Sequence, residues 1–139
     1  MGEVRALVPG PAAGPALVLT APLSFWGGVD EVDGTIIDRR HPQAGERVTG
    51  TVLVMPSGRG SSSSSSVLAE TIRAGTGPAA IVLAEPDGIL ALGSLVASML
   101  YGTTTPVVVV DDGIYRALAT EARVEIRSTG GGWEVVGRS

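Results

Sequence analysis

The sequence predicts an α/β domain in which a β-rich layer packs on a small β-α-β-α-β layer. Three observations predict this fold class. Short apolar runs dominate the first 55 residues, helix-like runs then alternate with apolar runs as far as residue 112, and the chain ends in a hairpin pattern around STGGGW. Alternating strands and helices are typical of a parallel α/β layer, and the runs at both ends supply the second layer.

The elements expected before residue 56 are strands and loops. Apolar runs predict strands at Glu3–Val8, Ala16–Thr20 and Gly50–Met55. The stretch PGPAAGP, residues 9–15, predicts a turn because proline fixes φ and glycine admits positive φ. Residues 22–42 are expected to be mostly loop, with a short strand near Thr35–Asp38.

After Met55 the spacing of apolar residues changes to that of helices. The first helix follows the serine run and is ended by GTGP, residues 75–78, and the second, Ile89–Tyr101, is closed by Gly102. Ile114–Ala119 is expected to form a helical turn. The strands expected around these helices are Ala79–Ala84, TPVVVVDD (105–112), ARVEIRS (122–128) and GGGWEVVG (130–137).

The length and composition of the chain exclude several classes of function. The 139 residues are expected to form one domain, residues 1–139, and the net charge of −4 includes ten arginines and no lysine, scattered along the chain. Without a basic stripe, nucleic acid is not expected as a partner. The chain has no cysteine, so it offers no disulfide, thiolate metal site or thiol nucleophile. Another chain would have to hold any iron–sulfur cluster.

No membrane association is expected either. The longest apolar-rich stretch, Ile89–Tyr101, is too short to span a bilayer. The N-terminus lacks the basic region of a signal peptide and the Ser or Thr of a myristoylation signal. A cytoplasmic protein is the expectation.

The stretch MPSGRGSSSSSSVLAE, residues 55–70, holds the most informative motif. Six consecutive serines are typical of a flexible linker, yet the flanking runs are core-like and there is no second domain to link. The alternatives are a purely structural helix cap and a functional site. Ser61 or Ser62 would cap the helix, whose free N–H groups and dipole favour an anion. Ser63–Ser66 are expected to be first-turn residues without chemistry, although Ser64 has the helical spacing of the apolar residues.

Common catalytic loops do not fit this motif. It lacks the lysine and the spacing of a Walker loop, and it lacks the G-x-S-x-G of a serine hydrolase. His41 is the only histidine, and a triad could be drawn with Asp38 or Asp30, but no spacing supports one. His41 is better interpreted as a polar loop residue or a hydrogen-bonded spacer.

The stretch PLSFWGGVD, residues 22–30, is unusual for a solvated loop because Phe25 and Trp26 are adjacent. These aromatic residues could plug one end of the core. They could equally form a wall of a binding cleft or a subunit interface, where tryptophan is enriched.

Three arginines are candidates for binding an acidic ligand. Arg39, Arg40 and Arg59 could each clamp a carboxylate or phosphate through the planar guanidinium group. Each could equally be a solvated surface residue.

Four motifs in this order, PLSFWGGVD, IIDRRHP, VLVMPSGRGSS and AEPDGILALGS, resemble the small subunit of the aconitase X family over roughly residues 3–128. The resemblance implies a swivelling β/β/α domain like the swivel domain of aconitases. It implies a dehydratase, that is a carbon–oxygen hydro-lyase, which acts on a small hydroxy acid together with a large aconitase X subunit. An iron–sulfur cluster or metal is expected on that large subunit, and no cofactor or metal on this chain.

The resemblance also implies site residues. The family's proton-accepting serine directly follows G-x-G, which makes it Ser61 here, with Ser62 as the runner-up or a cap. The implied substrate-binding residues are Gly58, Arg59, Gly60, Ser24, Phe25 and Trp26. No arginine follows the serines as it does in aconitases proper, so that substrate-binding role is not carried over. Many archaeal members have a lysine where this chain has Arg59.

Two substrates and one non-catalytic role stay open. The resemblance implies cis-3-hydroxy-L-proline in the bacterial branch, or mevalonate 5-phosphate in the archaeal branch, which gives trans-anhydromevalonate 5-phosphate. Arginine without lysine suggests a GC-rich genome and favours hydroxyproline. The alternative is a non-catalytic anion-binding or interaction module. A helix N-terminus contributes at most about 2 kcal/mol to serine deprotonation, so the isolated chain is expected to be inactive.

Overall fold

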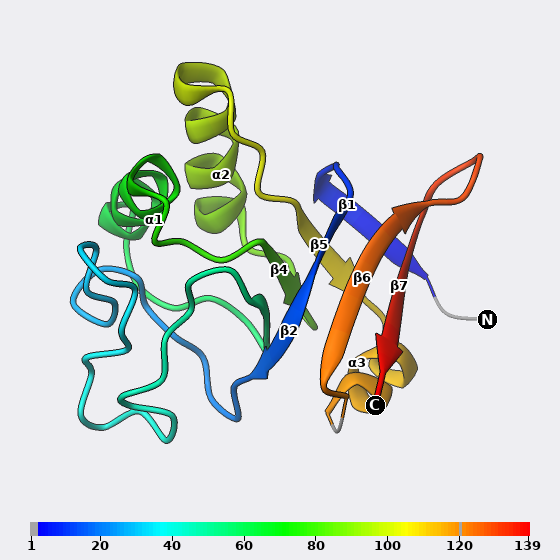
Figure 1. Cartoon of the computed structure of the whole chain (residues 1–139), viewed down its shortest axis with the longest axis horizontal. Helices are drawn as coiled ribbons and strands as arrows, with labels where there is room; N and C mark the ends of the chain where they lie inside the picture. The colour runs from blue at the N-terminus through cyan, green and yellow to red at the C-terminus, as the bar shows by residue number, and fades with distance from the viewer. Residues whose placement is uncertain (1–2, 120) are drawn as a thin grey trace.

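Seven strands form one mixed sheet, in the order β1-β5-β4-β3-β2-β6-β7, in the computed structural model, which describes residues 3–119 and 121–139 (Figure 1). The strands are β1 Val4–Val8, β2 Ala12–Val18, β3 Val52–Met55, β4 Ala80–Leu83, β5 Val107–Val110, β6 Arg123–Ser128 and β7 Trp133–Arg138. The helices are α1 Ser63–Ala74, α2 Gly88–Tyr101 and α3 Asp112–Leu118. None of these three helices has the length and apolar character needed to cross a bilayer.

Strand β2 joins the α/β part of the sheet to its antiparallel part. Ala16–Val18 pair in parallel with β3, whereas Ala12–Pro15 pair antiparallel with β6. Strands β3, β4 and β5 continue in parallel, β1 is antiparallel to β5, and β6 and β7 form the C-terminal hairpin. The predicted α/β class and the β-α-β-α-β part, β3-α1-β4-α2-β5, are confirmed.

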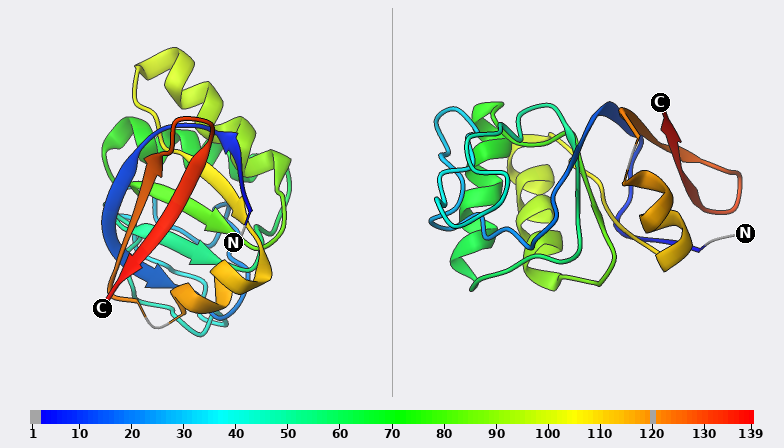
Figure 2. Two further views of the ribbon diagram at one scale, coloured as in Figure 1. Left: turned by 90° about the vertical axis from the view of Figure 1, so that its right-hand side faces the viewer. Right: turned by 90° about the horizontal axis from the view of Figure 1, so that it is seen from below.

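The two faces of the sheet bury two separate apolar clusters. Along β3, Leu53 and Met55 point to one cluster and Val52 and Val54 to the other, because successive side chains of a strand alternate between faces. Helices α1 and α2 and the long loop after β2 cover the first cluster (Figure 2). The sheet curls so that β6, β7 and α3 enclose the second cluster.

Two local predictions are wrong. The turn expected at residues 9–15 is shorter, because β2 begins at Ala12 and includes Pro15. A strand tolerates this proline because it lies at the end of the ladder with β6, where the pairing passes to β3. The short strand expected at Thr35–Asp38 is absent from the described residues, which have isolated bridges there instead.

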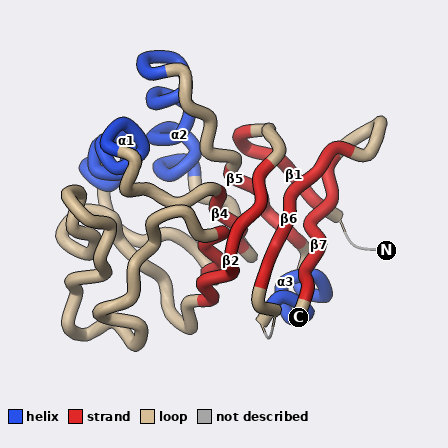
Figure 3. The backbone as a smooth tube through the Cα atoms, viewed as in Figure 1, coloured by secondary structure: helices blue, strands red, loops and turns tan. Residues whose placement is uncertain are grey.

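The loops that follow β2, β3 and β4 lie at one edge of the sheet. Strands β2, β3 and β4 run parallel, so their carboxyl ends meet at that edge. Residues 19–51 form a broad loop region beside α1 (Figure 3). In parallel α/β sheets, ligands bind outside the carboxyl ends of the strands, so a binding site is expected at this edge.

Candidate functional site

The glycine-serine turn after β3 packs between two neighbouring loops. Gly58 forms an isolated parallel bridge with Leu23, which lies in the loop after β2. On the other side, the Pro56 carbonyl accepts hydrogen bonds from Ala84 N–H and Glu85 N–H, both at 3.1 Å. These contacts fix the backbone that leads to the serine run.

Both glycines of G-x-G lie where a side chain would collide with a neighbour. A Cβ at Gly58 would overlap the Asp87 carboxylate, and one at Gly60 would lie 2.5 Å from Ser24 Oγ. Gly60 also has φ +111°, a conformation that other residues rarely adopt. The G-x-G pattern therefore reflects close backbone packing on both sides of Arg59.

The six serines are not a linker, because Ser63–Ser66 form the first turn of α1 and Ser62 is its N-cap residue. Ser61, Ser62 and Ser63 are exposed. Ser62 occupies the N-cap position, but the prediction that its hydroxyl caps the helix is wrong. Its backbone is already helical, at φ −56° and ψ −22°, whereas a side-chain cap requires the extended region. Ser61 Oγ accepts from Ser63 N–H at 3.4 Å, which is a long hydrogen bond. This leaves the Ser61 and Ser62 hydroxyls facing solvent.

Ser64 is a buried residue beside the candidate site whose contacts the sequence did not reveal. Its side chain is only 1% exposed, and its hydroxyl lies 3.1 Å from Ser24 Oγ and 3.4 Å from Trp26 N. It therefore joins the first turn of α1 to the aromatic loop. The one available signal was its helical spacing with the apolar residues of α1.

A hollow of about 310 Å³ opens beside the turn. It is lined by Pro22, Ser24, Trp26, Gly27, Gly28, Asp38, Arg40, Arg59 and Gly60. Its volume is at the lower end of the range for small-molecule pockets, roughly 300–1,000 Å³. Ser24, Trp26, Arg59 and Gly60 thus come together as predicted site residues. Gly58, Ser61 and Ser62 are not among the residues that line this hollow.

The adjacent aromatic residues have opposite environments. Phe25 is fully buried in the core, at 0% exposure, whereas Trp26 is 61% exposed and lines the hollow. The core-plug interpretation fits Phe25, and the cleft-wall interpretation fits Trp26. The Phe25 side chain has no access to a ligand in the hollow.

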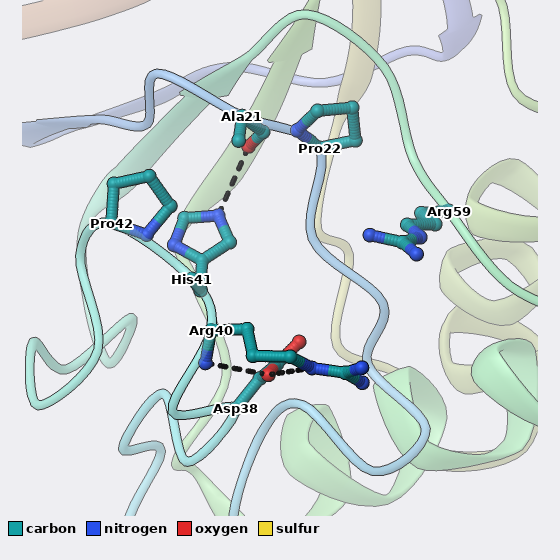
Figure 4. A pocket seen from close by; sticks show the side chains of 7 residues that line it. All are labelled: Ala21, Pro22, Asp38, Arg40, His41, Pro42 and Arg59. Atoms are coloured by element: carbon teal, nitrogen blue, oxygen red, sulfur yellow. Dashed lines mark hydrogen bonds and ion pairs between the residues drawn. The ribbon is translucent and has the colours of Figure 1, made fainter.

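Charged groups from two loops face a second, adjoining hollow (Figure 4). Arg59 points into the space between Pro22 and Arg40, and no described residue forms an ion pair with it. Arg40 Nε lies 3.7 Å from Asp38 Oδ1, but the Arg40 side chain is 93% exposed, so the pair contributes little. The mouth of the site thus offers two guanidinium groups and one carboxylate. Arg39 is exposed and lines neither hollow.

His41 is a buried, hydrogen-bonded spacer, as one of its two interpretations predicted. Its Nδ1 accepts a hydrogen bond from Gln43 N–H at 3.0 Å, so its proton is on Nε2, which donates to the Ala21 carbonyl at 3.0 Å (Figure 4). Both ring nitrogens are engaged in holding the loop. Within residues 3–119 and 121–139, no three His, Asp or Glu side chains cluster as metal ligands would.

Comparisons with known proteins agree with this architecture. The family profile of the aconitase X swivel domain matches residues 2–135. A crystal structure of Thermococcus kodakaraensis aconitase X in its holo-form superposes with a TM-score of 0.78 at 28% identity and covers 97% of both chains. A solution NMR structure of a UPF0107 protein superposes with a TM-score of 0.80 at 33% identity, over 98% of this chain and 99% of that one.

Relatives of known name fall into two groups. Cis-3-hydroxy-L-proline dehydratase of Pseudomonas aeruginosa is 52% identical over 103 residues, which are 74% of this chain and 18% of that protein. The Hypocrea jecorina protein of the same name is 45% identical over 75% of this chain and 17% of its own length. The phosphomevalonate dehydratase small subunit of Methanothermobacter thermautotrophicus is 40% identical over 70% of this chain and 74% of its own. The chain thus spans less than a fifth of the first two relatives and most of the third.

Proposed function

Because the chain belongs to the aconitase X swivel-domain family, we propose that it is the small subunit of a dehydratase that acts on cis-3-hydroxy-L-proline. The observation that carries this proposal is the 52% identity with the Pseudomonas aeruginosa enzyme of that name. The chain spans 18% of that enzyme, and the proposal places the rest of the active site on a large subunit. The hollow beside the glycine-serine turn is this chain's share of the joint active site.

Ser61 is the base in this proposal. Its hydroxyl is exposed at the start of α1, directly after Gly60 at the rim of the hollow. As an alkoxide, the serine accepts a proton from the substrate carbon next to the activating group, and the electrons of that C–H bond form a carbon–carbon double bond. The substrate hydroxyl leaves as hydroxide and becomes water by taking up the proton that was released when the alkoxide formed. Ser62 is the alternative base, one residue further along the exposed first turn.

The energy of serine deprotonation explains why a partner is required. A serine hydroxyl is about as weak an acid as water, so forming an alkoxide near neutral pH costs on the order of 11 kcal/mol. The N-terminus of α1 contributes at most about 2 kcal/mol of this. Cations of the partner and the exclusion of water from a closed cleft must supply the rest, or the proton must move in concert with departure of the hydroxyl. The isolated chain should therefore be inactive.

The proposal assigns the iron–sulfur cluster or metal to the large subunit. This chain has no cysteine, and its described residues bring no three carboxylate or imidazole groups together. Such a group, when bound by the partner, would polarise the departing hydroxyl. This chain's residues would bind the substrate anion, exclude water and accept the proton.

A second candidate substrate is mevalonate 5-phosphate. It is supported by the 40% identity with the Methanothermobacter thermautotrophicus phosphomevalonate dehydratase small subunit, of which the chain covers 74%. Arg59 and the exposed N-terminus of α1 offer groups that suit a phosphate. The two substrates share the anion and the hydroxyl that the proposed site requires.

The test is to purify this chain together with its large partner and assay both substrates. We expect dehydration of cis-3-hydroxy-L-proline, with Ser61→Ala lowering kcat about 10²–10⁴-fold. Ser66→Ala is the matched control, since Ser66 is an exposed serine of the same helix. Loss in Ser62→Ala in place of Ser61→Ala would move the base by one residue, and activity on mevalonate 5-phosphate alone would favour the second candidate. An inactive pair with saturable phosphate binding to this chain would favour an anion-binding module.

A further inference from the structure

A closed hydrogen-bond ring connects the aromatic loop to the first turn of α1. Ser24 Oγ donates its only proton to the Trp26 carbonyl at 3.0 Å. In the 3.1 Å contact between the two serine hydroxyls, Ser64 must therefore be the donor and Ser24 the acceptor. Ser64 Oγ in turn accepts a long hydrogen bond from Trp26 N–H, at 3.4 Å. This hydrogen-bond ring runs from Trp26 through Ser64 and Ser24 back to Trp26.

The hydrogen-bonding groups of the ring are satisfied by one another. Ser64 is 1% exposed, and a buried hydroxyl without a partner is costly, so its two contacts satisfy it. Alanine at this position would leave Trp26 N–H without its acceptor and Ser24 Oγ without its donor. Cooperative polarisation makes such a network more rigid than separate hydrogen bonds.

The backbone that carries the proposed base rests on this ring. A Cβ at Gly60 would lie 2.5 Å from Ser24 Oγ and 2.8 Å from Ser64 Oγ, so the two hydroxyls press against the Cα of Gly60. Ser61 is the next residue, and its carbonyl accepts from Ser64 N–H at 2.9 Å. The position of Ser61 is therefore set by the hydrogen-bond ring on one side and by the helical turn on the other.

We propose that Ser64 is a positioning residue, whose hydroxyl fixes Ser61 relative to the Trp26 wall of the hollow. The proposal rests on Ser61 being the base. A displacement of about 1 Å of a reacting group can lower a rate about 10²-fold. The groups suited to bind the substrate anion, Arg40 and Arg59, lie outside the hydrogen-bond ring. Loss of the Ser64 hydroxyl should thus lower kcat much more than it raises KM.

The first test uses the complete complex with its large partner. We expect Ser64→Ala to lower kcat about 10- to 100-fold while KM changes less than about threefold. Ser94→Ala is the matched control, because Ser94 is an equally buried helical serine whose hydroxyl donates to the Thr105 carbonyl. It loses a comparable hydrogen bond and should keep the wild-type kcat. An equal fall in kcat for both variants would overturn the proposal.

A double-mutant cycle with Ser24 keeps the proposal falsifiable if Ser64→Ala folds poorly. If both hydroxyls act through one ring, Ser24→Ala alone should lower kcat, and the double variant should lose little more than the worse single variant. Independent, multiplying losses would overturn the shared action. Ser64→Thr retains the hydroxyl and should restore part of the lost kcat.

A readout independent of catalysis separates this proposal from the proposed function. In the chain itself, hydrogen exchange of Trp26 N–H should accelerate in Ser64→Ala and not in Ser94→Ala. Faster exchange with unchanged kcat would overturn positioning while leaving the dehydratase proposal intact. Full activity in Ser61→Ala would instead remove the proposed base, and the role of Ser64 in positioning it would be refuted with it.

Discussion

The carboxylate of Asp87 lies directly against the Cα of Gly58. Its Oδ1 caps α2 by accepting from Ile89 N–H at 2.9 Å and Leu90 N–H at 3.1 Å, while Oδ2 faces the glycine. The turn that leads to Ser61 and the start of α2 therefore depend on one another. A substitution at Gly58 should therefore perturb both the glycine-serine turn and the start of α2.

Gly58→Ala should destabilise the fold and impair the complex. The added Cβ would overlap Asp87 Oδ2 and approach Leu90 Cδ1, and overpacking of this kind costs about 1–3 kcal/mol. Urea unfolding of this chain measures the loss. Gly88→Ala is the matched control, because a Cβ added there would have no neighbouring atom within 4 Å. As a helical glycine it should be neutral or stabilising by up to about 1 kcal/mol, and an equal loss at both glycines would contradict the steric argument.

Arg59→Ala should weaken substrate binding in the complete complex. Arg59 faces both hollows and has no ion-pair partner among the described residues, so its guanidinium is available to an anion. Loss of a charged hydrogen bond corresponds to about a 10- to 100-fold rise in KM with a smaller change in kcat. Arg59→Lys should recover part of the affinity, since lysine keeps the charge without the planar fork.

Arg39→Ala is the control for Arg59. Arg39 is exposed on the neighbouring loop but lines neither hollow. Its removal changes the net charge by the same amount and should leave KM near the wild-type value. Similar KM changes in both variants would mean that the net positive charge matters and the position of Arg59 does not.

Asp111→Ala should lower stability in a pH-dependent way. Hydrogen bonds from the backbone N–H groups of Ile114 and then Glu3 hold the pKa of Asp111 below its ordinary value of 3.8. A lowered pKa means that the contribution to stability is complete above the unfolded-state value and is lost as the pH falls through the folded-state value. In urea unfolding, the deficit of the variant should thus be largest near neutral pH and shrink below pH 3.8.

Arg116→Ala serves as the comparison for Asp111. It removes the exposed ion pair between Arg116 and Asp112, which should contribute little at any pH. If the deficit of Asp111→Ala stayed constant down to about pH 2, the charged form of Asp111 would not be the stabilising species.

The α/β part of the fold was predictable because its signals are local. Helix α1 has an apolar period and α2 is a nearly continuous apolar run of helical length, and each ends at a glycine with positive φ, Gly75 at 77° and Gly102 at 73°. Strand β4 is a short apolar run between α1 and α2, and β5 is another that follows α2. Each of these features depends on neighbours in sequence, which is the information that a single sequence holds.

Apart from the cap expected at Ser62, whose backbone is already helical, what the sequence missed concerns contacts between distant residues. The split pairing of β2 depends on β3 and β6, which lie far along the chain, so its start could not be read from PGPAAGP. The burial of Phe25 and exposure of Trp26 have no periodic signal because they lie in a loop. The contact of Ser64 with Ser24 spans 40 residues and is invisible in the serine run itself. The dehydratase roles of Ser61 and Arg59 stay predictions.

The pairing of strand β1 limits the order in which the sheet can form during synthesis. In the sheet it pairs only with β5, with Val4 opposite Val110. A ribosome adds about 5–20 residues per second, so β1 is synthesised about 5–20 s before its partner exists. During that interval the backbone N–H and C=O groups of β1 lack their strand partner. Strand β1 therefore cannot join the sheet while the chain up to β5 is being synthesised, and this edge of the sheet forms only after β5 has emerged from the ribosome.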